Sequence, residues 1–253
     1  MQMRFKSILK KKREIRILLE KILPIKIFRT LFTIYGIIKR PQKSFSQKGE
    51  DIIVHAFFGR RPQGFYLDIG AFHPRWISNT CLLHQSGWEG VAIDLDQYKL
   101  NVFKLLRGKK VKTIHSAVVP YKQEKSLINV YKFFSKRGWS DVDTLDLDTA
   151  EYLKQNGRGD YVIDKVPSID INSLLEKLPK VDFLNIDIEG LDTDIVTAIN
   201  LNKFKIDVIL FEDNKNYGGQ PLLIKKLKNH GYFHLFTSGG SVCFALKSSI
   251  IQK

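Results

Sequence analysis

Two apolar stretches of the chain end in a carboxylate followed closely by a glycine. The first ends at Asp68 and Gly70, and the second, about 120 positions later, ends at Asp187, Glu189 and Gly190. A carboxylate and a glycine at the carboxyl end of a buried strand are typical of an α/β sheet that binds a cofactor across its strand ends. The glycine lets the backbone turn and approach a ligand without a Cβ atom in the way. The pattern predicts one site assembled from two distant strands.

A further carboxylate ends another apolar run. Asp94 directly terminates residues 90–94, at a position where an acid usually accepts hydrogen bonds from the two ribose hydroxyls of a nucleotide. Asp96 is the rival for this role, and Asp94 is preferred because it ends the run itself. Ser116 and Ala117 follow the next predicted strand, where an adenine ring would lie. These strand ends predict a nucleotide-type cofactor site.

The elements that would position these side chains alternate between strand and helix. We predict strands at 65–68, 90–94, 112–116, 182–187, 206–211, 232–236 and 242–246, and helices near 78–87, 97–107, 172–178, 192–199 and 220–230. This alternation predicts an α/β fold with a seven-stranded, mostly parallel sheet. The stretch 121–167 lacks clear periodicity, and we predict a hairpin at 127–134 and an acidic loop at 141–148 within it.

Composition narrows the class of protein. The chain has 253 residues, 43% of them apolar, which is enough for one α/β domain with a full core. Its two cysteines, Cys81 and Cys243, form no CxxC or Cys/His cluster, so a structural zinc site and a disulfide framework are disfavoured. Cysteine usage fits a reducing compartment, and we expect the protein in the cytoplasm.

The net charge is concentrated at the N-terminus. Residues 1–43 hold 13 Lys and Arg against two Glu, a net charge of +11, whereas residues 44–253 hold 28 basic and 24 acidic residues, a net charge of +4. Apolar residues at 15, 18, 19 and 22 predict an amphipathic helix, which charged residues interrupt too often for a membrane span. Two interpretations stay open: peripheral contact of residues 1–40 with the anionic inner face of a membrane, or packing on the domain or on a second subunit. The arm carries no nucleic-acid motif, so no nucleic-acid partner is expected.

Four stretches of the chain, taken in order, match one family pattern. They are Ser46–Asp51, Asp68–Pro74 followed by Ser78–Thr80, Gly87–Gly90 leading to Asp94, and Ile186–Gly190. On these stretches the chain resembles the FkbM family of methyltransferases, over roughly residues 44–246. The resemblance implies a Rossmann-like class I methyltransferase fold and S-adenosylmethionine as cofactor. It divides the chain into a basic amphipathic helical arm, 1–43, and an FkbM-type methyltransferase domain, 44–253.

The resemblance also implies a set of cofactor contacts. The predicted cofactor-binding residues are Gln47, Asp51, Asp68, Gly70, Asn79, Thr80, Asp94 and Ser116. Asp68 would accept a hydrogen bond from the ammonium group of the cofactor's methionine part. The alternative is that Asp68 caps the next helix. The stretch 46–51 could equally be a helix-capping sequence, since Ser46 and Glu50 flank a predicted helix start. The stretch 78–80 also offers an N-cap for the next helix, but contact of Asn79 or Thr80 with the cofactor is preferred.

Methyl transfer to an oxygen needs a means of removing the hydroxyl proton, and two solutions fit the sequence. In the first, a catalytic base does so, and the candidates are His73, Asp187 and Glu189. The alternative for His73 is a loop histidine that hydrogen-bonds locally. In the second, Asp187, Glu212 and Asp213 bind Mg²⁺, which lowers the pKa of the hydroxyl. The alternative is that Asp187 and Glu189 orient acceptor hydroxyls without a metal ion.

The acceptor is predicted from loops that would face it. Residues 216–220 and 238–240 and Trp139 supply amide and aromatic groups that suit a saccharide ring. Together with the basic arm, they favour O-methylation of a sugar hydroxyl in surface glycan or polysaccharide biosynthesis. Two alternatives stay open: O-methylation of a small natural product (a polyketide or a peptide), and a non-catalytic, membrane-tethered binding module.

Overall fold

The computed structural model describes residues 44–59, 61–122, 127–133, 142–188, 190–213 and 220–249. The predicted arm at 1–43, the candidate base Glu189 and the loop residues Trp139 and 214–219 lie outside this part of the chain. Their predicted roles therefore stay predictions. None of the helices within the described ranges is both long enough and apolar enough to cross a membrane.

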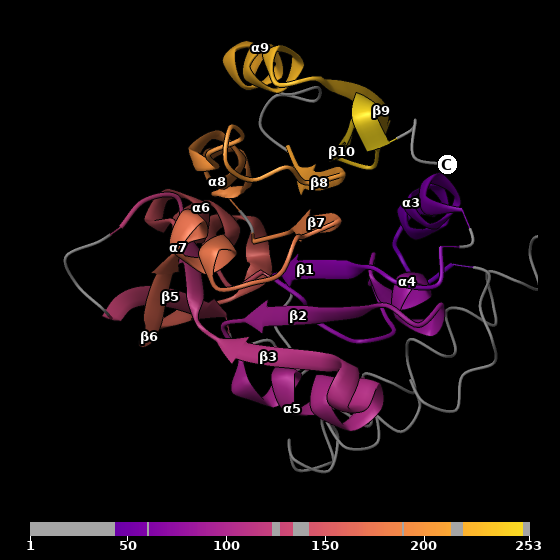
Figure 1. Cartoon of the computed structure of the whole chain (residues 1–253). Helices are drawn as coiled ribbons and strands as arrows, with labels where there is room; N and C mark the ends of the chain where they lie inside the picture. Colours follow the sequence, from indigo (N-terminus) through magenta and orange to yellow (C-terminus); the bar gives the residue numbers. More distant parts are fainter. Residues whose placement is uncertain are drawn as a thin grey trace, which may run out of the picture.

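A seven-stranded sheet forms the centre of the fold (Figure 1). Its strands are β1 (Phe65–Ile69), β2 (Glu89–Asp94), β3 (Val111–His115), β7 (Phe183–Ile186), β8 (Val208–Glu212), β9 (Tyr232–Ser238) and β10 (Ser241–Leu246). The order is β3-β2-β1-β7-β8-β10-β9, and β10 alone runs against its neighbours in this sheet. The order reverses between β1 and β7, which is the doubly wound arrangement that places ligands over the strand ends. The predicted Rossmann-like α/β methyltransferase fold is confirmed.

Helices cover both faces of this sheet and bury two separate apolar cores. They are α3 (Glu50–Phe58), α4 (Cys81–Gln85), α5 (Gln97–Arg107), α7 (Ile171–Glu176), α8 (Asp192–Ala198) and α9 (Pro221–Asn229). A further helix, α6 (Leu147–Leu153), contributes to neither of these two cores. One core packs α7, α8 and α9 against Leu67 and Ile69 of β1, and the other packs α3, α4 and α5 against Tyr66 of the same strand. Side chains alternate across a strand, so β1 supplies both cores.

A second, three-stranded sheet lies beyond the carboxyl ends of the central strands (Figure 1). It consists of β4 (Ala117–Val119), β6 (Tyr161–Asp170) and β5 (Leu127–Phe133) in that order. The prediction of a hairpin at 127–134 is wrong, because β5 pairs antiparallel with β6, about 30 residues further along the chain. This sheet and α6 stand over the strand ends and wall the space above them.

Three helices begin at an aspartate that caps them. Asp96, Asp146 and Asp170 accept backbone N–H groups of Tyr98, Thr149 and Ser173 at 2.8, 3.0 and 3.0 Å. Such caps satisfy N–H groups that have no partner in the first turn of a helix. Asp96 is thereby committed to starting α5, which leaves the strand-end position to Asp94.

Candidate active site

The strand pairing brings three predicted site residues to one level of the sheet. Ile69 of β1 pairs with Ile93 on one side and Ile186 on the other, so Gly70 lies level with Asp94 and Asp187. All three line one pocket, together with Ser116. Neighbouring parallel strands lie about 4.8 Å apart, which is why residues so distant in sequence meet here.

Gly70 is required by its surroundings. Its φ is +77°, and a Cβ atom at this position would lie 1.8 Å from the carbonyl oxygen of Asp187. Its N–H and that of Ala71 both donate to the Ile93 carbonyl, at 2.9 and 3.0 Å, which bends the chain over β2. A side chain would push β1 and β7 apart at the point where the ligand site is built.

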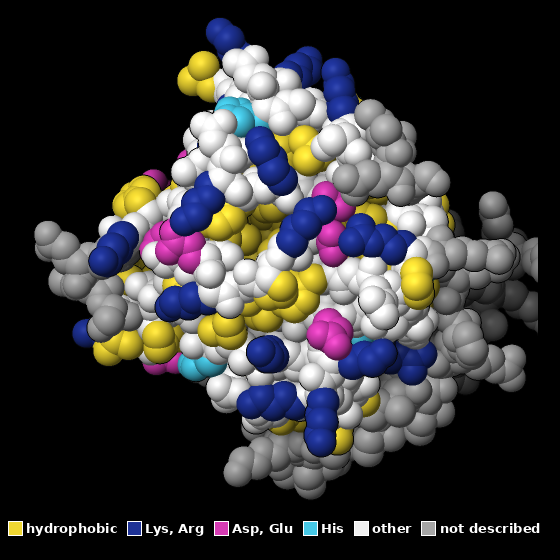
Figure 2. All heavy atoms as spheres, in the orientation of Figure 1, with side chains coloured by type: hydrophobic (Ala, Val, Ile, Leu, Met, Phe, Trp, Pro, Cys, Tyr) yellow, Lys and Arg dark blue, Asp and Glu magenta, His cyan; other side chains and the backbone are white. Residues whose placement is uncertain are grey.

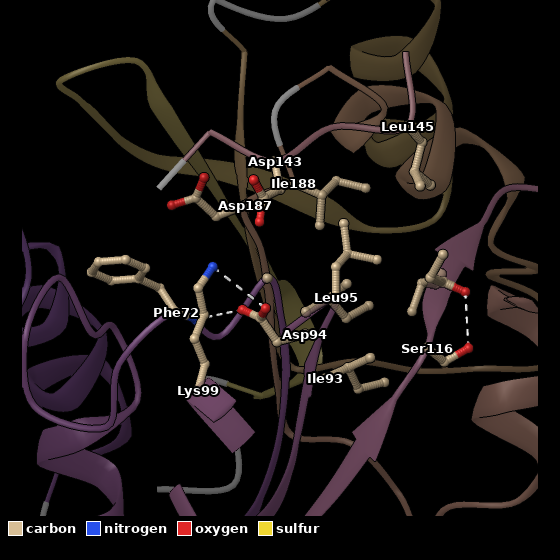
Figure 3. Close-up of a pocket in the computed structure, with 14 residues that line it drawn as sticks. Phe72, Ile93, Asp94, Leu95, Lys99, Ser116, Asp143, Leu145, Asp187 and Ile188 are labelled. Carbon is tan, nitrogen blue, oxygen red and sulfur yellow. Dashed lines mark hydrogen bonds and ion pairs between the residues drawn. The ribbon is translucent and has the colours of Figure 1, made fainter. Parts of the chain in front are cut away.

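Asp94 is held by three donors at the edge of the pocket, and two of them, Phe72 and Lys99, are drawn in Figure 3. Its carboxylate accepts the N–H groups of Phe72 and Asp96 at 3.0 and 2.8 Å, and the ammonium of Lys99 lies 3.5 Å away. Lys99 is buried and stands over the ring of Phe72 at 5.3 Å. Burial acts to lower the pKa of Lys99, but the negative charges of Asp94, Asp143 and Asp96 outweigh it, so the pKa is raised and the side chain stays protonated.

Ser116 and the apolar residues around it form the other end of this pocket. Ile93, Leu95, Val118 and Leu145 line it, and the Ser116 hydroxyl donates to the Pro167 carbonyl at 2.9 Å. An apolar slot with a carboxylate at one end matches an adenosine group, whose ring is apolar on both faces and whose ribose carries hydroxyls.

Asp68 lies below the pocket rather than in its lining. Its two oxygens accept from Thr80 Oγ1 at 2.6 Å and from Asn185 Nδ2 at 2.9 Å, and Asn79 Nδ2 donates to Asn185 at 2.9 Å. Burial raises the pKa of Asp68, while the charge of Arg107 and these hydrogen bonds act to lower it. The three predicted contacts Asp68, Asn79 and Thr80 therefore form one buried network beneath the turn at Gly70.

Arg107, which the sequence analysis overlooked, anchors that network. It is 5% exposed, and its guanidinium donates to Thr80 Oγ1 and Tyr66 Oη at 2.8 Å each. It also donates to the Pro74 carbonyl at 2.7 Å and to Ser78 Oγ at 2.9 Å. The burial of Arg107 could have been predicted from the sequence, because residues 100, 103 and 107 have the spacing of one helix face and the first two are apolar.

His73 has the geometry of a structural histidine. It is fully buried, and its Nδ1 accepts the backbone N–H groups of Arg75 and Trp76 at 3.0 and 3.1 Å. Burial first, and then the charges of Arg107 and Arg75, lower its pKa from 6.5 to about 3. This favours the local hydrogen-bonding alternative over the predicted role as base.

Asp51 and Gln47, predicted as neighbouring contacts, occupy different surroundings. Asp51 is buried and accepts from Ser44 Oγ, Ser46 Oγ and Phe45 N at 2.6, 2.8 and 2.7 Å. These bonds fix the turn before α3, although no side-chain hydrogen bond caps that helix at its N-cap residue, Gly49. Gln47 instead lines a large cleft beside the pocket of Gly70, Asp94 and Ser116, which we call the cofactor pocket.

That cleft has a volume of about 1060 Å³ and shares Gly70, Phe72 and Asp187 with the cofactor pocket. Glu212 and Asp213, at the end of β8, also line it. Within the described residues, however, no three acidic, His or Cys side chains are arranged to hold a metal ion, so the predicted Mg²⁺ set of Asp187, Glu212 and Asp213 is not assembled.

Asp192, the first residue of α8, was also missed. Its carboxylate accepts the N–H groups of Ile188 and Gly190 at 3.2 and 3.3 Å, which fixes the loop that follows Asp187. Burial, and then the negative charge of Glu212, raise the pKa of Asp192 from 3.8 to about 7. The sequence could have indicated this role, because Asp192 lies only two residues after the Asp-x-Glu-Gly pattern at 187–190.

Comparison with known proteins gives a family match and several distant structural likenesses. The family model described as the methyltransferase FkbM domain matches residues 68–233. None of the curated proteins compared with the chain matches it.

Three solved structures illustrate the distant likenesses. The 1,6-didemethyltoxoflavin N1-methyltransferase of Burkholderia thailandensis, solved with S-adenosylhomocysteine, is 12% identical over 78% of this chain and 76% of that one, at a TM-score of 0.40. The O-methyltransferase of Bacillus cereus, also in complex with S-adenosylhomocysteine, is 11% identical over 92% and 97%, at 0.39. The TehB-like methyltransferase of Corynebacterium glutamicum is 11% identical over 88% and 98%, at 0.41. At these TM-scores the likenesses carry no argument about chemistry.

Proposed function

The chain belongs to the FkbM methyltransferase family, and from this premise we propose that it transfers the methyl group of S-adenosylmethionine to a hydroxyl oxygen of a sugar in surface-glycan biosynthesis. The observation that carries the proposal is the position of Asp187. Among the described carboxylates, it alone lines both the cofactor pocket and the large cleft. A group at that boundary can contact an acceptor hydroxyl next to the methyl donor.

The lining of the pocket fits the nucleoside end of the cofactor in its chemistry. Gly70 leaves the space that a Cβ would fill, Asp94 presents a carboxylate at the level of a ribose, and apolar side chains such as Ile93 and Val118 flank the adenine region. When bound, S-adenosylmethionine supplies an electrophilic methyl group on a positively charged sulfur. The residues named here would hold its nucleoside end, and the buried network around Asp68 would place negative charge beneath its methionine end.

The chain's own contribution to the reaction is to align the acceptor and remove a proton. The methyl–sulfur bond breaks as a methyl–oxygen bond forms, and the hydroxyl proton leaves to a base. Asp187 is placed to accept that proton and to orient the hydroxyl, because it lies where the two cavities meet. The cleft offers further carboxylate, hydroxyl and amide groups, including Thr149, Thr193 and Gln47, which suit the many hydroxyls of a saccharide.

Two substitutions separate cofactor binding from chemistry. We expect Asp94→Ala to raise the Kd for S-adenosylmethionine by about tenfold or more, since a hydrogen bond to a charged group contributes about 1.5–3 kcal/mol. We expect Asp187→Asn to lower kcat by about 10²–10⁴-fold with little change in that Kd. Asp160→Asn, at a side chain that is 85% exposed, is the matched control and should change neither quantity.

The measurements are calorimetric titration with S-adenosylmethionine, with and without Mg²⁺, and transfer of labelled methyl to a panel of glycans. Label on sugar hydroxyls supports the proposal. Label only on a polyketide or peptide hydroxyl would favour the natural-product alternative. Cofactor binding without transfer to any acceptor would favour the binding-module alternative. Equal loss of cofactor affinity in both variants would show that Asp187 belongs to the cofactor site alone.

A further inference from the structure

The large cleft is acidic in an otherwise basic protein. Its described lining holds six carboxylates and two basic side chains, a local formal charge of −4 (−3 when Asp192, whose pKa is raised to about 7, is protonated), whereas residues 44–253 as a whole carry +4. The carboxylates are Asp146, Asp148, Asp187, Asp192, Glu212 and Asp213, and the basic residues are Lys48 and Arg158. Lys and Arg side chains are scattered over the face shown in Figure 2, so overall composition does not account for the acidity of the cleft.

The nucleoside end of the cofactor does not account for this charge either. Of the six carboxylates, only Asp187 also lines the cofactor pocket. The other five come from α6 and its cap, from the start of α8 and from the end of β8, and they surround the space left for the acceptor. Negative potential in a concave, partly shielded site favours cationic ligands and disfavours anionic ones.

Asp213 gives an independent indication that a donor belongs in the cleft. It is 2% exposed, and its Oδ2 has no hydrogen-bond partner among the described residues. A buried carboxylate oxygen without a donor costs free energy, because water has been removed and nothing has replaced it. A ligand N–H group or hydroxyl in the cleft would supply the missing bond.

The spread of the charge distinguishes an organic cation from a metal ion. No three of the carboxylates in the described lining converge on one point, as a divalent cation would require. Asp148 on α6 and Asp213 after β8 instead belong to separate elements on the wall of the same cleft. Separated acceptors match a ligand with several donors along its length.

We propose that the acceptor is an amino sugar, a hydroxylated ring bearing a protonated amine, and that the cleft discriminates against acidic sugars. The inference rests on the proposed function and specifies its substrate class. A carboxylate beside an ammonium keeps it protonated, and a protonated amine has no lone pair with which to attack the methyl group. The hydroxyl oxygen therefore remains the nucleophile, its proton leaves to Asp187, and the ammonium keeps its own protons.

Binding of three tetrasaccharides tests the charge directly. They are the β-1,4-linked tetramer of glucosamine, its fully N-acetylated neutral form, and tetragalacturonic acid, each titrated calorimetrically in the presence of S-adenosylhomocysteine. We expect the glucosamine tetramer to bind about tenfold more tightly than the neutral form and the acid to bind weakest, since each partly exposed ion pair contributes roughly two- to fivefold. Raising the salt concentration should narrow the difference. Equal binding of the three, tightest binding of the acid, or binding of none would overturn the inference.

Matched variants tie the preference to the cleft. Asp148 is exposed at the cleft wall, so Asp148→Asn should leave folding intact and reduce the preference for the cationic tetramer by about two- to fivefold. Asp213→Asn should reduce it further. Glu176→Gln, on α7 and outside the described lining of the cleft, removes the same charge and should leave the preference unchanged. A drop caused equally by Glu176→Gln would mean that net charge, and not the cleft, sets the preference.

Failure of the inference can be told from failure of the proposed function by locating the methyl group on the product. Methylated hydroxyls with no preference for the cationic sugar would overturn the substrate class and leave O-methylation standing. A preference for the cationic sugar with the methyl group on nitrogen would overturn O-methylation and leave the charge selection standing.

Discussion

Replacing Arg107 should reduce the stability of the domain. Its guanidinium donates to the hydroxyls of Tyr66, Thr80 and Ser78 at 2.8, 2.8 and 2.9 Å. It donates also to the Pro74 carbonyl at 2.7 Å. Removing one member of a buried charged network costs about 3–5 kcal/mol, because the remaining polar groups keep no partner and have no water. We expect Arg107→Met to lower the free energy of unfolding by about 4 kcal/mol, in the middle of that range.

The same substitution should weaken cofactor binding in a pH-dependent way. Burial raises the pKa of Asp68, and the charge of Arg107 opposes that rise. Without the guanidinium the pKa of Asp68 rises further, so the carboxyl is neutral over a wider range and offers no charge to the ammonium of S-adenosylmethionine. The affinity of Arg107→Met for the cofactor should therefore decrease further below that of the wild type as the pH is lowered, and should approach it as the pH rises.

Denaturant unfolding and calorimetric titration at several pH values measure both effects. Arg107→Lys is the matched control, because it keeps the charge and loses the planar fork of donors. Arg107→Lys should lose stability while its cofactor affinity keeps the pH dependence of the wild type. If Arg107→Met does not fold, the loss of stability can be measured with Arg107→Lys instead. An unchanged unfolding midpoint, or a ratio of the two Kd values that stays constant with pH, would refute the role assigned to Arg107.

Three further predictions follow from individual contacts. The pKa of Asp192 is raised from 3.8 to about 7, so the free energy of unfolding should fall by roughly 4 kcal/mol as the pH rises from about 4 to about 7. Unfolding of Asp192→Asn, measured across the same range, should show no such fall. Gly70→Ala would place Cβ 1.8 Å from the Asp187 carbonyl oxygen, so it should lower the free energy of unfolding by about 3 kcal/mol or more and abolish cofactor binding. Gly108→Ala, which meets open space, is the control and should lower it by about 1 kcal/mol. Burial lowers the pKa of His73 to about 3, so His73→Gln should leave the shape of the pH–rate profile near neutrality unchanged; loss of an inflection near pH 6–7 would restore His73 as the base.

The sequence predicted the central sheet well, because its strands are short apolar runs bounded by glycine and charge. All seven were placed within a few residues of their observed bounds. Asp94, preferred over Asp96 as the strand-end carboxylate, lines the pocket, whereas Asp96 caps α5. The small sheet could not be predicted in the same way. Buried and exposed residues alternate only weakly along β6 (Tyr161–Asp170), and several of its residues are exposed. Its pairing with β5 joins segments that are distant in the sequence, which no local pattern encodes.

The described residues do not assemble the predicted Mg²⁺ ligands, for a related reason. Asp187, Glu212 and Asp213 are close in the strand order, and closeness along a sheet edge is visible in the sequence. Convergence on one point is not visible there, because it depends on which face each strand-end side chain takes. Arg107 shows the opposite case, in which an available helix-face signal was overlooked because arginine is so often exposed.

Depth along the strands separates supporting carboxylates from those that face the ligand. Asp68 pairs with Ala92 and Asn185, two positions before the level of Gly70, so its side chain is enclosed by the sheet and both of its oxygens accept internal hydrogen bonds. Asp94 and Asp187 lie at the level of Gly70, where the strands end and the pocket opens. A carboxylate two residues before the glycine therefore fixes the turn and supplies charge from below. A carboxylate level with the glycine lines the pocket, so we expect substitutions of Asp94 and Asp187 to act on binding and turnover. Substitution of Asp94 should cost stability as well, because its oxygens also accept the N–H groups of Phe72 and Asp96.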